Sequence, residues 1–168
     1  MGSEMCIRDR SGIIAVHSED TTIKQMLESI QQQFNVKVRE KNITLSLCDT
    51  DLHIRCDSKW TVEALGNIVD NAIKYTACGG NVQIKVEQYS FFVKIDIIDD
   101  GIGIEKEEIP KIFGRFYRSL SVADQPGVGI GLFLAREIIQ AQKGYIKVTS
   151  KRGKGSTFSV FLPIAKKE

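Results

Sequence analysis

Apolar residues recur at intervals of three and four along three stretches of the chain, the spacing of helices with one buried face. The first stretch covers residues 23–38, and the second begins at Asp57 or Ser58 and runs to about Thr76. The third covers about residues 129–142 and is followed by a glycine that can end a helix. The chain is therefore expected to contain three amphipathic helices.

Other stretches alternate apolar and polar residues, which is typical of half-buried strands, and residues 12–16 form a short apolar run that is expected to be an edge strand. The predicted strands are residues 12–16, 43–47, 52–55, 82–88, 91–98, 145–150 and 157–162. The last four of these stretches are expected to form two hairpins; Gly79-Gly80 ends the preceding helix ahead of the first, and a turn containing Gly153 and Gly155 joins the strands of the second. The mixed order of helices and hairpins predicts a two-layer α/β sandwich, in which a mixed, mostly antiparallel sheet of about five strands packs on three helices.

Composition narrows the class of protein without identifying it. The length of 168 residues suits about one domain, and the formal charge of +2 gives no reason to expect nucleic acid or a membrane surface as a partner. No stretch is apolar for long enough to span a bilayer. Residues 1–10 lack periodicity and are expected to be a cloning-derived leader, which leaves residues 11–168 as the domain.

The second predicted helix carries a polar face that a core could not accommodate. Asn67, Asn71, Lys74 and Tyr75 recur at intervals of four, three and one, and so project from the same side. An amide oxygen is a hard ligand suited to Mg²⁺, and an ammonium group offsets phosphate charge. The pattern is also compatible with an ordinary solvated helix face.

A carboxylate and two glycines follow the apolar strand that ends at Ile98. Asp99 at the end of this strand can accept a hydrogen bond from an exocyclic amine, as adenine recognition requires. Gly101 and Gly103 allow the backbone to approach a ligand closely. The same residues would also suit a tight Asp-Gly turn, and they lack the third glycine of a dinucleotide-binding fingerprint.

A second glycine group, Gly127, Gly129 and Gly131, opens the third helix and can present backbone N–H groups to phosphate oxygens. Before it lies a polar loop that begins with aromatic residues and contains Arg115 and Arg118 near its start. Such a loop suits a mobile lid, and either arginine can reach a γ-phosphate. A structural glycine-rich helix start and a plain surface loop remain alternatives.

Four segments follow one another along the chain: the polar helix face, the Asp99–Gly103 segment, the loop with Arg115 and Arg118, and the glycine group from Gly127 to Gly131. In this order they resemble the boxes of the catalytic ATP-binding domain of sensor histidine kinases, in the GHKL superfamily with its Bergerat fold. The resemblance covers about Ile13 to Ala165. It implies that ATP and Mg²⁺ are bound, with Asn71 as the metal ligand and Arg118 and Asn71 as catalytic residues. The implied ATP-binding residues are Asn67, Asn71, Lys74, Tyr75, Asp99, Gly101, Gly103, Ile104, Tyr117, Arg118, Gly127, Val128, Gly129, Ile130, Gly131, Leu132 and Thr157.

One position separates the branches of this superfamily. Its ATP-hydrolysing members carry a glutamate four residues before the metal-binding asparagine, where it acts as general base. Asn67 occupies that position here and cannot accept a proton. The resemblance therefore favours phosphoryl transfer to a protein side chain. A serine kinase or ATPase of the same superfamily, or a degenerate module that only senses nucleotide, is the alternative.

Neither histidine of the chain fits the phosphoacceptor. His17 and His53 both lack the flanking residues of that motif and the helical hairpin that carries it. The resemblance thus implies a catalytic domain that acts on a histidine-bearing dimerisation domain outside this chain and signals to a response regulator. By itself the fragment is expected to be monomeric and cytoplasmic, without membrane contact or autophosphorylation, and to derive from a membrane-anchored sensor.

Overall fold

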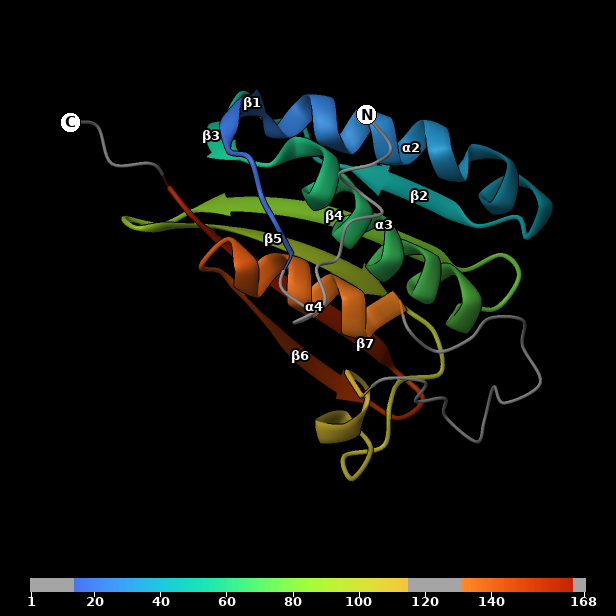
Figure 1. Cartoon of the computed structure of the whole chain (residues 1–168). Coiled ribbons are helices and arrows are strands. Elements are labelled where there is room, and N and C mark those ends of the chain that lie inside the picture. The colour runs from blue at the N-terminus through green and yellow to red at the C-terminus, as the bar shows by residue number, and fades with distance from the viewer. Residues whose placement is uncertain (1–13, 115–130, 165–168) are drawn as a thin grey trace.

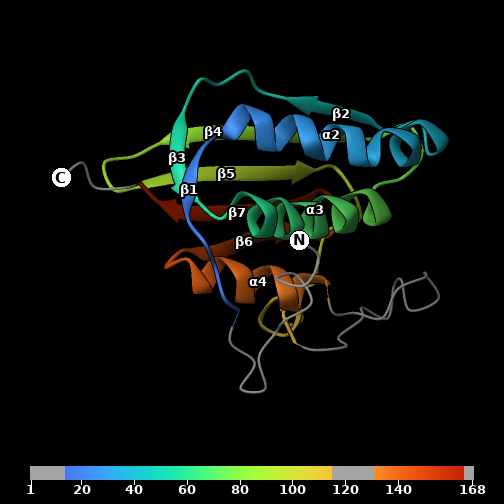
Figure 2. The ribbon, with the colours of Figure 1, turned by 45° about the horizontal axis from the view of Figure 1, so that its top comes forward.

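In a computed structural model, described over residues 14–114 and 131–164, helices and sheet form two layers (Figure 1). The helices are α2 (Ile23–Glu40), α3 (Ser58–Tyr75) and α4 (Gly131–Ala141), with a 3₁₀ turn, η1 (Ile109–Lys111). The strands are β1 (Glu19–Thr22), β2 (Thr44–Leu47), β3 (His53–Cys56), β4 (Asn81–Gln88), β5 (Phe92–Asp99), β6 (Tyr145–Lys151) and β7 (Gly155–Pro163). The turned view shows the three helices side by side on one face of the sheet (Figure 2).

The main sheet has five strands in the order β2-β4-β5-β7-β6. Only the β2–β4 pair is parallel, and the other three pairs are antiparallel. A separate two-stranded sheet joins β1 to β3. The predicted two-layer α/β sandwich with a mixed, mostly antiparallel sheet is therefore confirmed.

Both long helices begin at side-chain caps. The Thr22 hydroxyl accepts a hydrogen bond from the Gln25 N–H at 3.2 Å, and an Asp57 carboxylate oxygen accepts one from the Trp60 N–H at 3.0 Å. Each bond satisfies a backbone donor that the first helical turn leaves free. Of the two candidate caps for α3, Asp57 is thus the residue used.

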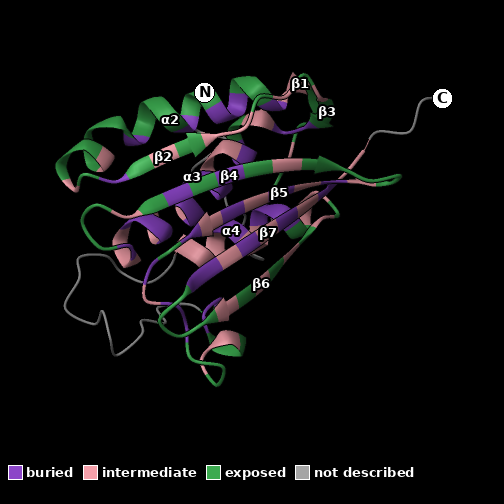
Figure 3. Cartoon of the chain, turned by 180° about the vertical axis from the view of Figure 1, so that it is seen from behind, coloured by how far each residue is buried: buried purple, intermediate pink, exposed green. Residues whose placement is uncertain are grey.

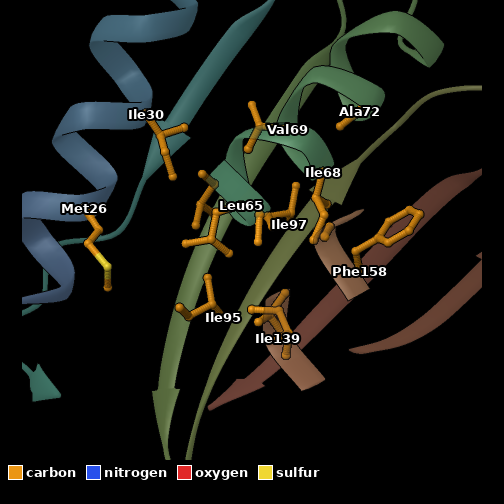
Figure 4. Close-up of a cluster of buried hydrophobic side chains, with 14 of the residues drawn as sticks. Met26, Ile30, Leu65, Ile68, Val69, Ala72, Ile95, Ile97, Ile139 and Phe158 are labelled. Carbon is orange, nitrogen blue, oxygen red and sulfur yellow. The ribbon is translucent and has the colours of Figure 1, made fainter. Parts of the chain in front are cut away.

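The core lies between α3 and the middle of the sheet, where aliphatic side chains from both layers meet (Figure 4). Burying each such side chain contributes roughly 1.5–3 kcal/mol. Because the apolar face of α3 is fully occupied here, its polar face must point elsewhere. The labelled core residues are Met26, Ile30, Leu65, Ile68, Val69, Ala72, Ile95, Ile97, Ile139 and Phe158.

The first predicted strand is wrong. Residues 14–18 contain a single bridge residue, Ile14, and the first strand is instead β1, Glu19–Thr22. β1 is polar, and it forms because it pairs antiparallel with β3 from Glu19–Cys56 to Thr22–His53. The apolar character of Ile14 serves burial in the core rather than a sheet edge, since only 4% of its surface is exposed.

The sheet face opposite the helices is largely exposed or half-buried (Figure 3). On β5, buried residues alternate with half-buried ones, so Val93, Ile95, Ile97 and Asp99 share the helix side. Within the described residues, no helix has the length and apolar character needed to cross a lipid bilayer.

Candidate nucleotide site

The polar face of α3 meets the start of α4. The Asn67 side-chain amide donates a hydrogen bond to the Gly131 carbonyl oxygen at 3.1 Å. A side chain on Gly131 would contact Asn67, since an added Cβ would lie 3.7 Å from its Cβ and Cγ. Asn71 and Lys74 follow one and two turns later, both half-buried. The structure therefore brings the first polar segment against the second glycine segment.

The other end of α3 meets the loop that follows β5. The Ile102 N–H donates to the Tyr75 carbonyl oxygen at 3.2 Å. An added Cβ on Gly101 would lie 2.3 Å from that oxygen, which is closer than any real contact allows. Glycine at position 101 is thus required for the loop to approach α3, and this contact places Asp99 near the C-terminal end of the polar face.

Lys74 belongs to a small network of charges on α3. Its ammonium lies 3.5 Å from the Asp70 carboxylate, one turn earlier, and the same carboxylate pairs with Lys37 of α2 at 2.8 Å. Lys41 donates to the carbonyl oxygens of Ile73 and Lys74 at 2.7 and 3.0 Å. These bonds cap the last turn of α3 and hold Lys74 at the end of the helix.

Asp99 is a buried carboxyl group, with 5% of its surface exposed. The Gly101 N–H donates to it at 2.9 Å. Burial raises the pKa of Asp99 above its ordinary value, while the N–H groups of Gly101 and Ser156 act in the opposite direction. A buried acceptor of this kind is able to select a ligand that offers an N–H donor, because an unpaired partner would be costly.

A hydroxyl pair supports this loop from the β6–β7 hairpin. The Ser150 hydroxyl accepts a hydrogen bond from the Ile104 N–H at 2.7 Å and lies 2.7 Å from the Ser156 hydroxyl. Gly103 has a φ of +74°, and an added Cβ would lie 2.2 Å from the Lys151 carbonyl oxygen. The loop from Gly101 to Ile104 is therefore fixed against both α3 and the hairpin.

Thr157, which the resemblance implies as an ATP-binding residue, lies on the face of the sheet away from Asp99. The strand register pairs Thr157 with Ile98 and pairs Ser156 with Asp99. Because directly paired residues share a face, Ser156 and Asp99 both point to the helix side. Ser156 is buried, with 6% exposed, and is the residue that the sequence pattern did not single out. The sequence did offer a signal: Ser156 lies two residues before the apolar Phe158, and in a strand residues two apart point to the same face.

Several predicted site residues lie outside the described residues. These are Tyr117, Arg118, Gly127, Val128, Gly129 and Ile130, together with Arg115. Leu132, the second residue of α4, is half-buried and packs against the core. Its side chain is therefore engaged in packing at the start of the helix.

The donor set agrees with a magnesium-bound adenine nucleotide. Asn67 and Asn71 supply amide oxygens and Lys74 supplies a cation along one helix face, and a buried carboxyl lies beyond the end of that face. Mg²⁺ commonly takes one or two oxygen ligands from protein and keeps water and phosphate oxygens for the rest. The described residues therefore fit a site for ATP, with Asn71 as the predicted metal ligand.

The model of the histidine kinase-, DNA gyrase B- and HSP90-like ATPase family matches residues 56–166. This range contains α3, the loop after β5, α4 and the β6–β7 hairpin, which are the elements that build the site. The chain belongs to this family. Membership in a family of ATPases implies an ATP-binding domain.

Within the family, the chain is similar to sensor histidine kinases. It is 38% identical over 122 residues to the sensor histidine kinase WalK of Bacillus subtilis, which covers 70% of this chain and 20% of WalK. The chain thus spans about a fifth of the length of that relative.

Solved structures of histidine kinases share the fold of this chain. The mycobacterial sensor histidine kinase MprB superposes with a TM-score of 0.77 at 25% identity, over 88% of this chain and 98% of that one. The histidine kinase ThkA, solved in complex with the response regulator TrrA, has a TM-score of 0.74 at 24% identity, over 89% and 42%. The fold is that of a histidine kinase catalytic domain.

Proposed function

We propose that this chain binds Mg-ATP and that, in a complete sensor kinase, it transfers the γ-phosphoryl group to a histidine of a dimerisation domain. The observation that carries this proposal is the Asn67–Gly131 hydrogen bond. The bond requires an N–H donor at position 67, so an amide rather than a carboxylate suits this junction of α3 and α4. An amide cannot deprotonate water, which favours transfer over hydrolysis.

Each part of the site has a distinct role in this proposal. Asp99 accepts the exocyclic amine of adenine, and Ser156 helps to hold that carboxyl group in place. Asn71, with Asn67 beside it, holds Mg²⁺, and Lys74 contacts phosphate oxygens. When bound, Mg²⁺ offsets the charge of the phosphates.

Residues outside the described range complete the proposed site. Gly127 and Gly129 extend the glycine segment that ends at Gly131, where backbone N–H groups of the helix start favour phosphate. Arg118 stabilises charge on the transferred group, and Tyr117 lies beside it in sequence. Both roles rest on the family resemblance of their motif.

The proposed partners are the histidine-bearing dimerisation domain and a response regulator. The complex of the structurally similar ThkA with TrrA supports the second of these. The proposed setting is the cytoplasm, as part of a membrane-anchored sensor, with this fragment itself monomeric. Phosphoryl transfer then depends on a second domain to supply the acceptor.

The test is calorimetric titration of the chain with ATP, ADP and GTP, each with and without Mg²⁺. The proposal expects binding of ATP and ADP, strengthened by Mg²⁺ for ATP, and weak binding of GTP. Asp99→Asn should bind adenine nucleotides about 10–100-fold more weakly, whereas Asp100→Asn, which changes the exposed neighbour, should keep the affinity of the unmodified chain. A chain that binds no nucleotide would overturn the proposal in favour of a degenerate module.

A second assay separates transfer from hydrolysis. Phosphate release from ATP by the isolated chain should stay close to the buffer rate, because the site lacks a general base at position 67. Rapid release would indicate an ATPase, and labelling of an added protein on serine would indicate a serine kinase. Either outcome would contradict histidine phosphorylation while leaving nucleotide binding intact.

A further inference from the structure

The chain enters the domain through a leading segment, residues 14–18, that is bonded to the start of α3. The indole N–H of Trp60 donates to the Ala15 carbonyl oxygen at 3.0 Å. The His17 backbone N–H donates to Asp57 Oδ2 at 2.8 Å. Ile14 is buried in the core, so the leading segment is held at three of its residues, Ile14, Ala15 and His17.

Asp57 also connects this segment to the end of α4. Its backbone N–H donates to the side-chain oxygen of Gln142 at 2.8 Å, and the Gln142 amide donates to the Thr61 hydroxyl at 3.0 Å. Gln142 directly follows α4, and Thr61 is fully buried. We call the set of Asp57, Thr61 and Gln142 the joint. All three of its polar side chains are satisfied, so it is a specific connection.

The opposite end of α4 lies at the nucleotide site. Gly131, its first residue, accepts the hydrogen bond from Asn67. A helix of 11 residues is about 16 Å long and moves as a rigid rod. Ala135, Ile138 and Ile139 pack it into the core with no exposed surface. A displacement at the Gln142 end would therefore reach Gly131 rather than be absorbed within the helix.

We propose that the joint couples the leading segment to the nucleotide site through α4. With the segment seated on Asp57 and Trp60, α4 holds Gly131 in the position that binds nucleotide; displacing the segment shifts α4 and weakens binding. Asp57 and Gln142 are positioning residues in this scheme, which rests on the proposed ATP binding. Linkage requires the reverse effect, so bound nucleotide must tighten the leading segment.

The sharpest test removes one hydrogen bond of the segment. His17→Pro deletes the N–H that bonds to Asp57, whereas His17→Ala changes the same exposed side chain and keeps that N–H. The proposal expects His17→Pro to weaken Mg-ATP binding by roughly 5-fold or more, the lower range of such couplings, with no change for His17→Ala. Affinity is measured well below the melting temperature, so that a small loss of stability does not alter it.

A second pair of variants addresses the joint itself. Gln142→Ala removes both of its side-chain bonds, and Gln140→Ala changes an exposed glutamine of the same helix. Only the first should weaken Mg-ATP binding. Equal affinity of His17→Pro, Gln142→Ala and the unmodified chain would overturn the proposal, because the joint would then be an anchor alone.

Hydrogen exchange and fluorescence give readouts that a purely structural anchor would not produce. Saturating Mg-ATP should slow exchange of the His17 amide in the unmodified chain and not in Gln142→Ala. Without nucleotide, His17→Pro should speed exchange at Leu134 and Ala135, in the first turns of α4. Unchanged α4 exchange would overturn the coupling, whereas absent nucleotide binding by the unmodified chain would overturn the proposed function as well.

Trp60 supplies an intrinsic signal, since it is the only tryptophan of the chain and is 4% exposed. Its emission should respond to Mg-ATP in the unmodified chain, although it lies at the opposite end of α3 from Lys74. The response should be lost in Gln142→Ala and kept in Gln140→Ala. An identical response in both variants would contradict coupling through the joint.

Discussion

Asp99 and Asp100 are adjacent in the chain, but their carboxyl groups lie in opposite environments. Asp99 is buried, and burial raises its pKa above the ordinary value of 3.8. Asp100 is exposed and accepts hydrogen bonds from the backbone N–H and side-chain amide of Asn81 at 2.9 and 3.0 Å, which lower its pKa. The end of β5 thus carries one carboxylate that costs stability and one that contributes to it.

The first prediction concerns Asp99→Asn. A raised folded-state pKa means that the contribution of Asp99 to stability is present below pH 3.8 and is lost as pH rises through the folded-state value. At pH 7 the neutral asparagine should therefore raise the melting temperature, with a smaller gain at pH 3. Mg-ATP affinity should fall by about 10–100-fold, the scale of a charge-assisted hydrogen bond. Thermal melts at both pH values and calorimetry check these outcomes.

Asp100→Asn is the matched control. Its lowered pKa contributes stability above pH 3.8 that is lost as pH falls through the folded-state value. The substitution should therefore lower stability at pH 7, by no more than about 1 kcal/mol because solvent screens this exposed group. Nucleotide affinity should be unchanged. The same sign of stability change in both variants would contradict the assigned environments.

The second prediction compares two glycines with positive φ. An added Cβ at Gly103 would lie 2.2 Å from the Lys151 carbonyl oxygen, whereas at Gly153 it would meet nothing within 4 Å. Gly153→Ala should lower the free energy of unfolding by about 1 kcal/mol, because alanine is strained in this backbone conformation. Gly103→Ala should cost about 2–4 kcal/mol, because the hairpin must also move. Denaturant unfolding measures both, and equal costs would show that the hairpin yields easily.

The third prediction concerns Lys74. Lys74→Met should weaken Mg-ATP binding by about 10-fold, the scale of one charge-assisted contact with phosphate. Stability should change by less than about 1 kcal/mol, since the pair with Asp70 is partly exposed. Lys37→Met, which breaks the shorter pair with the same carboxylate, should leave affinity unchanged. Titrations at two salt concentrations should show a weaker salt dependence for Lys74→Met only.

The fourth prediction addresses the branch of the family at Asn67. Asn67→Glu introduces a general base, and phosphate release from ATP should rise by about 10-fold, below the full range for a positioned base. The helix junction loses its N–H donor to Gly131 in this variant. Asn67→Gln matches the side-chain length of glutamate but carries an N–H donor and no general base, and its phosphate release should stay at the level of the unmodified chain. Equal rates for the two variants would refute the role assigned to this position.

The helices were predictable because local rules determine them. The apolar stripe of α2 from Ile23 to Phe34 is buried as its spacing predicts, and Asp57 caps α3. β1 was not predictable, since its polar residues form a strand only through pairing with β3. Local patterns describe what one element buries, and they do not report which distant segment pairs with it.

The residues of the candidate site also divide into those that local motifs reveal and those that only the folded structure reveals. Asn67, Lys74, Asp99 and the glycines carry chemistry that their motifs reveal, so their types predict a nucleotide site. The choice between Ser156 and Thr157 depends on a register of one residue, and one step moves a side chain to the other face. The joint at Gln142 lies 85 residues from Asp57 in sequence and belongs to no motif.

The parallel pairing of β2 with β4 makes α3 part of a crossover connection between two neighbouring strands. Such a helix cannot swing away from the sheet unless that strand pair separates, so its amides should exchange with solvent only through global unfolding. The wall of the site that carries Asn67, Asn71 and Lys74 is thus its stationary side. Any adaptation to nucleotides of different length is then expected at the other parts of the site, such as the start of α4 at Gly131.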